Sequence, residues 1–361
     1  MTESKVRFGV IGTTWYAETH LQNIQSHHGA ELVAITGRDR AKATEVAGRF
    51  SIPHVYTDYR DMISAGNIDA IVIVAPDEMH LPITMDALGA GLHVLCEKPL
   101  ATTAAAAQAM YERAETTGLK HMSFFALRTS MHHRYLRSLV EDGYLGQVYS
   151  AQFSLTHGFF RGDDYQWRFD AVRGTGALGD LGCYLIDQAR WYVGDIARVS
   201  TSLRNTISRP HSAGDAYEPA NDSAILGVEF RNGAHATMST NVVAHQAERK
   251  QTNTVVLQGE GGTLELQHTF AGAVLRGARS DEDEFRVLEI PADLWEGVDP
   301  SNPGMVGQVH SVGDRAFIDA ILNNEPITPS FYDGWKVQQV IETAFAANTS
   351  GSWESVPEDE S

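Results

Sequence analysis

The chain has 361 residues, of which 43% are hydrophobic and 20% are charged, values typical of a soluble globular protein with room for two domains. Its 28 basic and 46 acidic residues give a formal net charge of −18, which argues against a nucleic-acid or anionic-membrane surface. The two cysteines, Cys96 and Cys183, exclude a disulfide framework, and we expect buried thiols. No apolar run reaches the ~20 residues that span a bilayer, and no signal-peptide core follows Met1. We therefore expect a cytoplasmic protein.

Short apolar runs alternate with amphipathic segments from Val6 to about Phe124. Strands are predicted for VRFGVIG, AELVAITG, DAIVIVAP, LHVLCEK and HMSFFAL, and helices for THLQNIQSHH, RAKATEVAGRF and PITMDALGAG. Because the strands are continuously apolar rather than alternating, both of their faces are expected to be covered. This pattern predicts an α/β fold with a doubly wound parallel sheet, a Rossmann domain that would bind a dinucleotide, over residues 1–124.

The pattern changes after Phe124. Helices are predicted for MHHRYLRSLVEDGYLG, for about 177–193, for DRAFIDAILNN and for DGWKVQQVIETAFAAN, and the acidic tail SVPEDES is expected to fray. Strands are predicted for QVYSAQFSLTHG, RVSTSLRN, SAILGVEF, HATMSTNVVAH, TNTVVLQG and GTLELQH. This pattern predicts an α+β domain over residues 125–361, with a large mixed or antiparallel open sheet and helices on one face. We assign substrate binding and oligomerisation to this domain. We expect a second copy of the chain to cover the other face, giving a homodimer or homotetramer.

The segment FGVIGTTWYAETH, Phe8–His20, lies where a nucleotide-binding loop would be expected. In the dinucleotide fingerprint the first glycine allows a tight turn, the second lets the backbone approach the pyrophosphate, and a small third residue lets the helix pack. Gly12 and Ala17 suit the first and third roles, but Thr14 occupies the second. The helix N-terminus still offers N–H groups to a phosphate, and a hydroxyl adds a donor. The alternative is a plain strand–helix turn. The predicted cofactor contacts in this loop are Gly12, Thr13, Thr14, Trp15 and Tyr16.

Arg38 indicates which dinucleotide the loop would hold. A carboxylate about 20 residues past the loop usually bonds the ribose hydroxyls of NAD. In AELVAITGRD that position is Gly37, followed by Arg38. A guanidinium in place of the carboxylate suits the 2′-phosphate of NADP, so NADP is favoured over NAD. The alternative is that Arg38 is a solvated turn residue and that Asp39 caps the next helix.

The segment HVLCEKPLA contains a first candidate for catalysis. Glu97, Lys98 and Pro99 lie at the carboxyl end of a predicted buried strand, the edge at which open α/β sheets bind ligands. Proline cannot continue the strand, and it is expected to direct Lys98 into the crevice. A lysine there is suited to polarising a substrate hydroxyl or donating to a carbonyl oxygen. The alternative is a surface lysine at a strand end.

The run GTGALGDLGCYLIDQARWYVG contains a second candidate. On a helix, Asp180, Tyr184 and Asp187 are spaced i, i+4 and i+7 and share one face. A tyrosine needs a cation to act as a base near neutral pH, because its ordinary pKa is about 10, and Lys98 is a candidate for that cation. The alternative is amphipathic packing with Tyr184 half-buried. The glycines expected to let the helix start approach another backbone or a ligand are Gly174, Gly176 and Gly179.

The order of these features resembles a known family. The Gly12 loop, APDEMH, EKP and DLGCYLID follow one another as in the glucose–fructose oxidoreductase / inositol dehydrogenase / MocA (Gfo/Idh/MocA) family of NAD(P)-dependent sugar and cyclitol oxidoreductases. The resemblance covers nearly the whole chain, and EKP with D-x-G-x-[HY]-x-x-D is its most specific part. It implies that Lys98 is catalytic and that Asp180 and Tyr184 line the substrate pocket. Tyrosine in place of the frequent histidine resembles the branch with glucose–fructose oxidoreductase and dimeric dihydrodiol dehydrogenase, where tyrosine is the proposed acid/base.

The resemblance carries over further contacts. Pro76 and Asp77 match a Pro-Asn motif beside the nicotinamide and ribose, where aspartate keeps an acceptor but adds charge. His80 matches a recurrent histidine of that segment, with helix packing as the alternative. The remaining cofactor contacts implied are Glu97, Lys98, Arg128, Trp167 and Arg168, with ion pairing as the alternative for both arginines. The implied substrate contacts are Lys98, His157, Asp180 and Tyr184.

Two other histidines, His132 and His133, are expected on the surface of a helix. No histidine–carboxylate grouping in the sequence has the spacing of a metal site, so we expect no metal.

Together these features predict hydride transfer between C4 of nicotinamide and a carbinol carbon of a sugar, cyclitol or glycoside. Tyr184 would exchange the hydroxyl proton, Lys98 would stabilise the phenolate and orient the substrate oxygen, and Asp180 would hold a neighbouring hydroxyl. One alternative is a non-catalytic dinucleotide-binding sensor or regulator, which would not need Lys98 and Tyr184 together. Another is an enzyme with a tightly bound, recycled cofactor that acts on 3-oxo-sugars or glycosides.

Overall fold

The computed structural model describes residues 5–211, 216–295 and 305–358, and side chains in the last range from residue 312 onward. The chain forms two compact units. Unit 1 contains Met1–Ala126 and His310–Lys336, and unit 2 contains Leu127–Val309 and Val337–Ser361. The sequence had placed all of 125–361 in the second domain. Residues 310–336 belong to unit 1 because they pack on its strands and helices; Phe317, for example, makes an edge contact with Phe8 at a ring-centroid distance of 6.4 Å.

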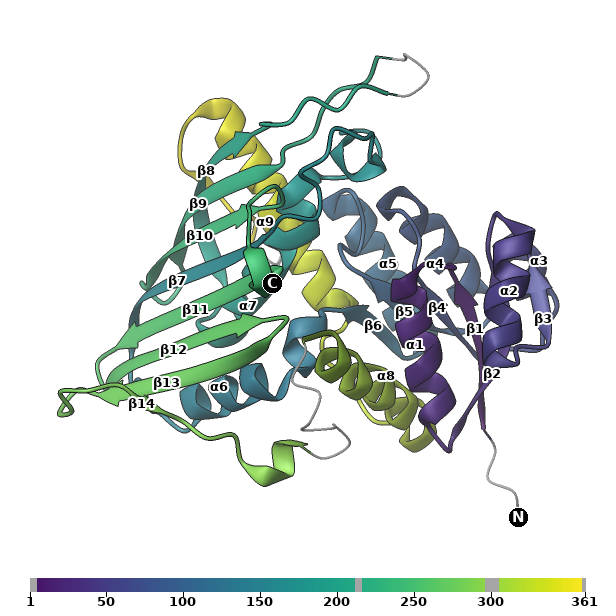
Figure 1. Ribbon diagram of the computed structural model, residues 1–361, viewed down its shortest axis with the longest axis horizontal. Helices are drawn as coiled ribbons and strands as arrows, with labels where there is room; N and C mark the ends of the chain where they lie inside the picture. Colours follow the sequence, from purple (N-terminus) through teal and green to yellow (C-terminus); the bar gives the residue numbers. More distant parts are fainter. Residues whose placement is uncertain (1–4, 212–215, 296–304, 359–361) are drawn as a thin grey trace. The chain divides into compact units, whose positions relative to one another are not determined.

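Unit 1 contains a six-stranded parallel sheet in the order β3-β2-β1-β4-β5-β6 (Figure 1). Its strands are β1 (Val6–Ile11), β2 (Ala30–Thr36), β3 (His54–Tyr56), β4 (Ala70–Ile73), β5 (His93–Glu97) and β6 (His121–Phe124). This order is the doubly wound Rossmann order, so the predicted fold class of the N-terminal half is confirmed. The sequence did not predict β3, which is too short to show a hydrophobic period.

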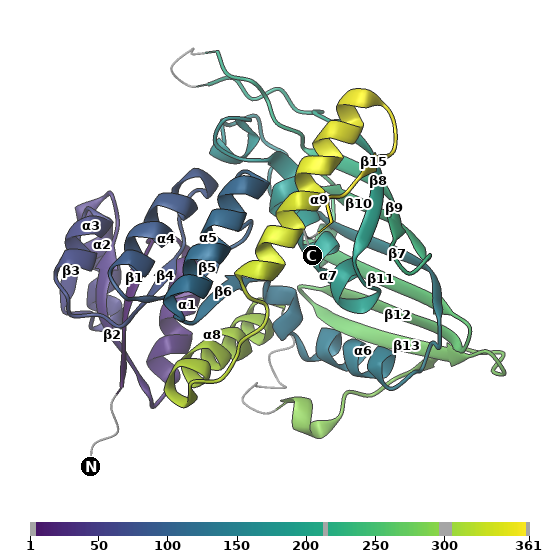
Figure 2. The same ribbon diagram turned by 180° about the vertical axis from the view of Figure 1, so that it is seen from behind.

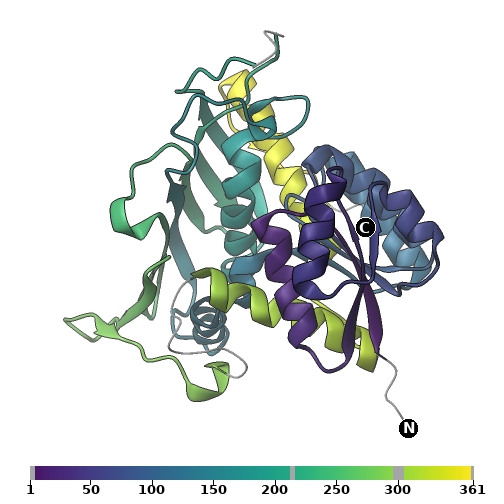
Figure 3. The ribbon, with the colours of Figure 1, turned by 45° about the vertical axis from the view of Figure 1, so that its right-hand side comes forward.

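Helices cover both faces of this sheet (Figure 3). They are α1 (Trp15–Ser26), α2 (Arg40–Phe50), α3 (Tyr59–Ser64), α4 (His80–Gly89), α5 (Ala104–Thr117) and α8 (Met305–Asn323). One core cluster joins strand residues such as Ile71 and Val94 to Ile83 of α4 and Met110 of α5. Helices α1 and α2 contact each other, and so do α3 with α4 and α4 with α5. The continuous apolar strands are therefore buried between two layers of helices, as their pattern predicts.

Strands β1 and β4 are neighbours in this sheet, and they mark the point where the winding direction reverses. The carboxyl ends of parallel strands lie at one edge of a sheet, and ligands of doubly wound proteins bind at that edge near the reversal. The segments that follow β1, β2, β4 and β5 begin with Gly12, Gly37, Val74 and Lys98. The fold thus places these predicted cofactor segments at one edge of unit 1.

Unit 2 contains a nine-stranded sheet in the order β14-β13-β12-β11-β7-β10-β9-β8-β15 (Figures 1 and 2). Its strands are β7 (Val148–His157), β8 (Ile196–Arg204), β9 (Ser223–Phe230), β10 (His235–Asn241), β11 (Gln251–Gly259), β12 (Gly262–Thr269), β13 (Gly272–Arg279), β14 (Arg286–Val287) and β15 (Glu354–Ser355). Strands β7 and β10 run parallel, while β10 with β9 and β7 with β11 are antiparallel, so the sheet is mixed, as predicted.

Side chains of this sheet alternate between a buried and an open face. In β7, Phe153 and Leu155 are buried while Gln152 is exposed, and in β9 Leu226 is buried while Ile225 is 61% exposed. The helices α6 (Met131–Glu141) and α7 (Cys183–Tyr192) pack on the buried face, and α9 (Phe331–Ser350) continues the chain from unit 1 into unit 2. The other face carries mostly Ser, Thr and Gln side chains in the strands around β7.

One sequence-based expectation about unit 2 is wrong, and two of its strands were not predicted. The tail was expected to fray, but Glu354–Ser355 pairs with β8 and the N–H of Val356 donates to the carbonyl of Ala197 at 2.9 Å. The pairing is possible because Val356 is buried and supplies an apolar anchor. Residues 359–361 of that tail lie outside the described residues. The sequence also did not predict β13 and β14, in which glycine and arginine interrupt the alternating pattern.

Both cysteines are buried free thiols. Among the described residues, no helix is both long enough and apolar enough to cross a membrane. In the same part of the chain, no three His, Cys, Asp or Glu side chains are arranged to hold a metal ion.

Candidate active site

Gly12 makes the turn between β1 and α1. Its φ angle is +126°, and a Cβ atom there would lie 2.5 Å from the carbonyl oxygen of Val74, so no other residue fits without displacing the backbone. Thr14 is the N-cap of α1, and its Oγ1 accepts the N–H of Ala17 at 3.4 Å. That bond uses a lone pair and not the hydroxyl hydrogen. Thr14 therefore caps the helix and keeps a donor for a phosphate at the helix N-terminus.

The rest of this loop combines an exposed tryptophan, beside a half-buried tyrosine, with a tightly packed threonine. Trp15 is 61% exposed and makes an edge contact with Tyr16 at a centroid distance of 5.1 Å. Thr13 lies against Gly37, where an added Cβ would be 2.6 Å from Thr13 Cγ2. The close approach of Thr13 explains why position 37, after β2, has no side chain.

In the turn after β2, the structure shows the Asp39 cap and leaves Arg38 exposed. Asp39 caps α2, since its Oδ1 accepts the N–H groups of Ala41 and Lys42 at 2.9 and 3.1 Å. The capping role that the alternative gave to Asp39 is confirmed. Arg38 itself is exposed, and its guanidinium takes no part in this cap.

His80 contacts two of the segments that follow the strands of unit 1. It is fully buried, with Nδ1 2.9 Å from the carbonyl oxygen of Pro99 and Nε2 3.0 Å from that of Ala75. Burial lowers the pKa of His80, and because a neutral ring has one N–H, it donates to only one of these two oxygens at a time. The contacts therefore join the segment after β4 to the segment after β5. Between them, Pro76 caps the short 3₁₀ helix Asp77–Met79, in which Asp77 is buried.

Glu97, the last residue of β5, lies in a buried chain of ionisable groups that the sequence did not predict. Its Oε1 is 3.0 Å from Nε2 of His20, and Nδ1 of His20 is 2.7 Å from Oδ1 of Asp314. Its Oε2 accepts the N–H of Lys98 at 3.2 Å. The sequence did hold a signal for His20. It falls on the same stripe of α1 as the apolar residues Ala17, Leu21 and Ile24, so the helix pattern itself places it in the interior.

In unit 2, the run that carries Asp180 and Tyr184 begins as a π-helical turn. The π-helix spans Leu178–Gly182 and contains Asp180, and α7 starts at Cys183. The sequence predicted one regular helix with an α-helical spacing between the two residues. A π turn has more residues per turn and often occurs at functional sites, so Asp180 is rotated relative to Tyr184 from that expectation. Tyr184 is 8% exposed, more buried than the half-buried alternative assumed.

Two of the three glycines before this helix do allow close backbone approach, as predicted. A Cβ at Gly174 would lie 3.0 Å from the carbonyl oxygen of Arg168, and one at Gly176, whose φ is +66°, would lie 2.3 Å from that of Asn221. Asn221 also holds the turn through its side chain, because Oδ1 accepts the N–H of Leu178 at 2.9 Å. The turn with Asp180 is therefore fixed from outside the helix.

Arg168 is the cation beside Asp180. Its Nε is 3.8 Å from Oδ1 of Asp180, and its guanidinium lies 4.6 Å from the ring centroid of Trp167. The Arg168 side chain is 34% exposed and that of Asp180 is 17% exposed. The sequence-predicted residues Trp167, Arg168 and Asp180 are thus brought together within unit 2.

Arg128 and His157 have partners inside unit 2. Arg128 forms a two-point ion pair with Asp187, which agrees with the ion-pair alternative for this arginine. His157 ends β7, is 3% exposed, accepts the N–H of Phe159 on Nδ1 at 3.3 Å and stacks on the Phe159 ring. Both side chains are therefore held by neighbouring residues of unit 2.

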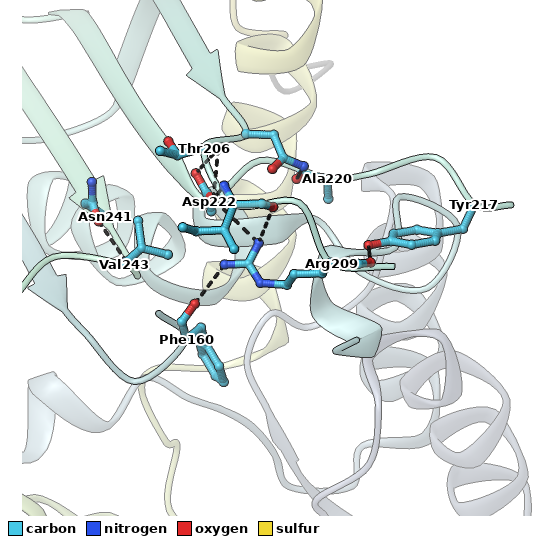
Figure 4. A network of polar contacts seen from close by, with 10 residues as sticks. Phe160, Thr206, Arg209, Tyr217, Ala220, Asp222, Asn241 and Val243 are labelled. Carbon is cyan, nitrogen blue, oxygen red and sulfur yellow. Dashed lines mark hydrogen bonds and ion pairs between the residues drawn. The ribbon is translucent and has the colours of Figure 1, made fainter. Parts of the chain in front are cut away.

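A buried ion pair holds the loops near this site (Figure 4). Arg209 is 3% exposed and Asp222 is fully buried. Asp222 accepts the N–H groups of Thr206 and Ile207, each at 2.9 Å, and lies 3.5 Å from Nη1 of Arg209. Nη2 of Arg209 donates to the carbonyl of Phe160 at 2.8 Å. The sequence did not predict this pair, which ties the 205–209 segment to the loop after β7.

His132 and His133 are buried, so their expected place on a helix surface is wrong. Helix α6 packs on β12, where His268 lies 5.7 and 5.5 Å from the two rings. His133 bonds through Nδ1 to the hydroxyl of Tyr192 at 2.7 Å. In the described part of the chain, Nδ1 of His132, Nε2 of His133 and both ring nitrogens of His268 lack a hydrogen-bond partner. Helix–sheet packing thus buries histidines that the sequence marks only as polar.

Comparison with known proteins identifies the family. Residues 6–125 match the model described as "Oxidoreductase family, NAD-binding Rossmann fold", and residues 133–265 match "GFO/IDH/MocA C-terminal domain". D-xylose 1-dehydrogenase (NADP(+)) 2 of Haloferax volcanii is 31% identical over 327 residues, which cover 88% of this chain and 96% of that protein. The chain belongs to the Gfo/Idh/MocA family. The resemblance in its motifs is therefore confirmed, and the protein is an NAD(P)-dependent oxidoreductase.

Other similar proteins agree over almost the full length. Levoglucosan dehydrogenase of Pseudarthrobacter phenanthrenivorans is 28% identical over 347 residues, which cover 88% of this chain and 87% of that protein. A solved structure of levoglucosan dehydrogenase, in complex with NADH and levoglucosan, has a TM-score of 0.90 and 26% identity, covering 98% of this chain and 100% of that one. The two-domain α/β fold class is confirmed by this match.

Proposed function

We propose that this protein transfers a hydride between a nicotinamide cofactor and a carbinol carbon of a sugar, cyclitol or glycoside. The observation that carries the proposal is the position of Lys98, directly after β5 at the carboxyl edge of a Rossmann sheet, where ligands of this fold bind. Relatives named as dehydrogenases of levoglucosan and D-xylose support a carbohydrate substrate.

Three side chains divide the work on the substrate. Tyr184 exchanges the hydroxyl proton, Lys98 stabilises the phenolate and orients the reacting oxygen, and Asp180 accepts a hydrogen bond from a neighbouring hydroxyl. His157 is a further substrate contact. The bound cofactor supplies the hydride acceptor or donor, while the protein aligns the groups and excludes water.

The loop after β1 fits a dinucleotide. Gly12 lets the backbone turn closely past Val74, and α1 presents its N-terminal N–H groups behind a threonine cap. We assign the pyrophosphate to this helix end and the nicotinamide half to the segments after β4 and β5. The cofactor contacts proposed are Gly12, Thr13, Thr14, Trp15, Tyr16, Arg38, Pro76, Asp77, His80, Glu97, Lys98, Arg128, Trp167 and Arg168.

NADP is the favoured dinucleotide. Position 37 has no carboxylate for the ribose hydroxyls, and the exposed Arg38 follows it, with Arg40 and Lys42 on the first turn of α2. A cluster of cations suits a 2′-phosphate. The Haloferax volcanii relative is named for NADP(+), whereas the levoglucosan dehydrogenase complex holds NADH.

The open face of the nine-stranded sheet is the proposed contact between copies. It combines exposed Ile225 and Val274 with small polar side chains, which suits a flat sheet-to-sheet contact in a homodimer or homotetramer. We propose a cytoplasmic location for this assembly.

A substrate panel tests the function. Polyols, aldoses and glycosides are incubated with purified protein and NADP or NAD in turn, and absorbance is followed at 340 nm. Turnover of a cyclic polyol or sugar with NADP supports the proposal. Tight binding of the dinucleotide without turnover of any panel member, measured on the same preparation, would instead indicate a sensor. Cofactor absorbance in protein purified without added dinucleotide would indicate a bound, recycled cofactor.

A further inference from the structure

A chain of buried ionisable groups leads from α1 and α8 to the backbone of Lys98. His20, Glu97 and Asp314 are 0%, 5% and 1% exposed. His20 contacts both carboxylates, at 3.0 Å from Glu97 and 2.7 Å from Asp314. The remaining carboxylate oxygens are also used, because Asn23 donates to Oδ2 of Asp314 at 2.7 Å and the N–H of Lys98 donates to Oε2 of Glu97 at 3.2 Å.

The geometry determines the charge of His20. Each ring nitrogen faces a carboxylate oxygen, and the ring donates on both sides only as an imidazolium. Burial by itself lowers the pKa of His20, but the charges and hydrogen bonds of Asp314 and Glu97 outweigh burial and raise it to about 10. The rings of Phe124 and Tyr16 lie 4.7 and 6.0 Å from it and add no charge. A neutral-pH imidazolium thus holds the carboxylate of Glu97 in place.

We propose that His20 is a positioning residue for Lys98, acting through the carboxylate of Glu97. The inference rests on the proposed role of Lys98 in proton handling. His20 fixes Oε1 of Glu97, and Oε2 then fixes the peptide N–H from which Lys98 branches. On the other side, His80 holds the carbonyl of Pro99 at 2.9 Å. Two buried histidines therefore restrain the backbone around Lys98: His20 acts through the carboxylate of Glu97, and His80 acts through the carbonyl of Pro99.

Restraint of the Lys98 backbone matters because catalytic groups tolerate little displacement. A misplacement of about 1 Å, even one caused far from the reacting atoms, costs on the order of 10²-fold in rate. Loss of His20 is therefore expected to lower kcat and to leave the substrate KM and cofactor binding close to normal, since neither ligand is proposed to contact His20 itself.

The same helix provides a matched control. His27, the C-cap of α1, is also buried and also bonds to an aspartate of α8, with Nε2 3.2 Å from Oδ1 of Asp319. Asp319 is half-exposed. Its partner His27 lies about two turns of α1 from His20, which contacts Glu97. His27→Gln removes a buried histidine–aspartate contact between the same two helices while leaving the Glu97 contact intact.

The experiment compares His20→Gln with His27→Gln, using the best substrate from the panel and a fluorescence titration with NADPH. We expect His20→Gln to lower kcat by roughly 10- to 100-fold, with KM and the NADPH Kd changed by less than about 3-fold. His27→Gln should stay within about 2-fold of wild type in all three. An unchanged kcat in folded His20→Gln would overturn the inference.

Two further measurements keep the test decisive if His20→Gln does not fold. Glu97→Leu has no acceptor, so it loses both the His20 and the Lys98 bond, and its kcat should fall similarly; an unchanged kcat refutes the link. In the wild type, ¹⁵N spectra should show His20 as an imidazolium at pH 7, and a neutral ring refutes it. If the wild type turns over a substrate and His20→Gln has the same kcat, only this inference is wrong. Absence of wild-type turnover across the panel removes the proposed function, while the spectra still report on His20.

Discussion

Arg128 and Asp187 form a two-point ion pair in which Nε and Nη2 of the arginine lie 2.8 and 2.6 Å from the two carboxylate oxygens. The side chains are 9% and 2% exposed. The guanidinium also lies over the ring of Trp191, 5.4 Å from its centroid. Because Asp187 lies in α7 one turn after Tyr184, this pair fixes the helix that carries the proposed acid/base.

Arg128→Met should destabilise the protein by about 3–5 kcal/mol, because it leaves a buried carboxylate without its cation. Urea unfolding measures the loss. Arg49→Met is the control, since Arg49 makes the same two-point contact with Glu18 at 2.7 Å on the surface, where a pair contributes about 1 kcal/mol or less. Equal losses in the two variants would contradict the interpretation. An NADPH titration of Arg128→Met also tests the proposed cofactor contact.

Lys98→Ala and Tyr184→Phe should each reduce kcat on the order of 10²–10⁴-fold, the usual contribution of acid–base catalysis. Absorbance at 340 nm measures the rates, and circular dichroism checks the fold. Lys5→Ala and Tyr149→Phe change an exposed lysine and a half-exposed tyrosine outside the proposed site and should leave kcat unchanged. Full activity in both folded site variants would end the proposed mechanism.

Arg38→Ala should weaken NADPH binding by about 10-fold or more and change NADH binding by less than about 3-fold, because only NADP carries the 2′-phosphate that an arginine contacts in two places. Fluorescence titration with each reduced cofactor measures the two Kd values. Arg49→Ala, in the last turn of α2, removes an arginine from the opposite end of the same helix. A parallel loss for NADH and NADPH would mean that Arg38 does not recognise the phosphate.

Arg209→Met should both destabilise unit 2 and raise the substrate KM. The variant loses the bond to the carbonyl of Phe160 and the cation beside Asp222, so about 3 kcal/mol is expected from urea unfolding. The loop after β7 is then less restrained, which should increase KM by roughly 3-fold or more. Arg209→Lys keeps the charge but not the two nitrogens that contact different partners. Its stability and KM should therefore lie between those of the wild type and of Arg209→Met. An Arg209→Met variant as stable as wild type would contradict this role.

Stability should fall in acid because of the buried histidines of unit 2. Burial lowers the pKa of His132 to about 4, and burial with the nearby His132 lowers that of His268 to about 3. In the unfolded chain both have a pKa of about 6.5, so below that pH the unfolded state binds protons that the folded state does not. The free energy of unfolding should therefore drop as pH falls from about 6.5 toward 4. His268→Leu should flatten this slope in urea titrations, and an unaltered slope would contradict it.

His20 should have the opposite effect at alkaline pH. Its pKa is raised to about 10, because Asp314 and Glu97 outweigh the effect of burial. Between about pH 6.5 and 10 the folded protein holds a proton that the unfolded chain has released, so stability should decline as pH rises through this window. His20→Gln should remove that decline. His27→Gln serves as the control and should retain it.

Much of the fold follows from local patterns. Continuous apolar runs predict the parallel strands of unit 1, and alternation predicts most strands of unit 2. Short or irregular elements could not be predicted this way, as β3 and β13 show. The π turn at Asp180 depends on contacts with Asn221, 41 residues away in the chain, that fix its approach from outside. A spacing rule for α-helices carries no information about such a contact.

The candidate site was predictable where chemistry is concentrated in a short motif. The Lys98 and Tyr184 motifs and the Gly12 loop each carry a local signal. The helix pattern places His20 in the interior but does not reveal its pairing with Glu97 and Asp314, because His20 and Asp314 are separated by 294 positions, and Arg209 is recognisable as the partner of Asp222 only once its loop is folded. Burial also reversed the expectation for His132 and His133. Long-range polar pairing is thus what the sequence could not supply.

The contact between Thr13 and Gly37 constrains any attempt to redesign coenzyme preference. Installing an aspartate at position 37 is the usual way to recruit the adenosine ribose of NAD, but its Cβ would meet Thr13 Cγ2 at 2.6 Å. A single exchange would therefore force the Thr13 side chain to move. Replacing Thr13 with serine or glycine in the same step would relieve this contact, so a change of coenzyme preference at position 37 has to be designed together with position 13.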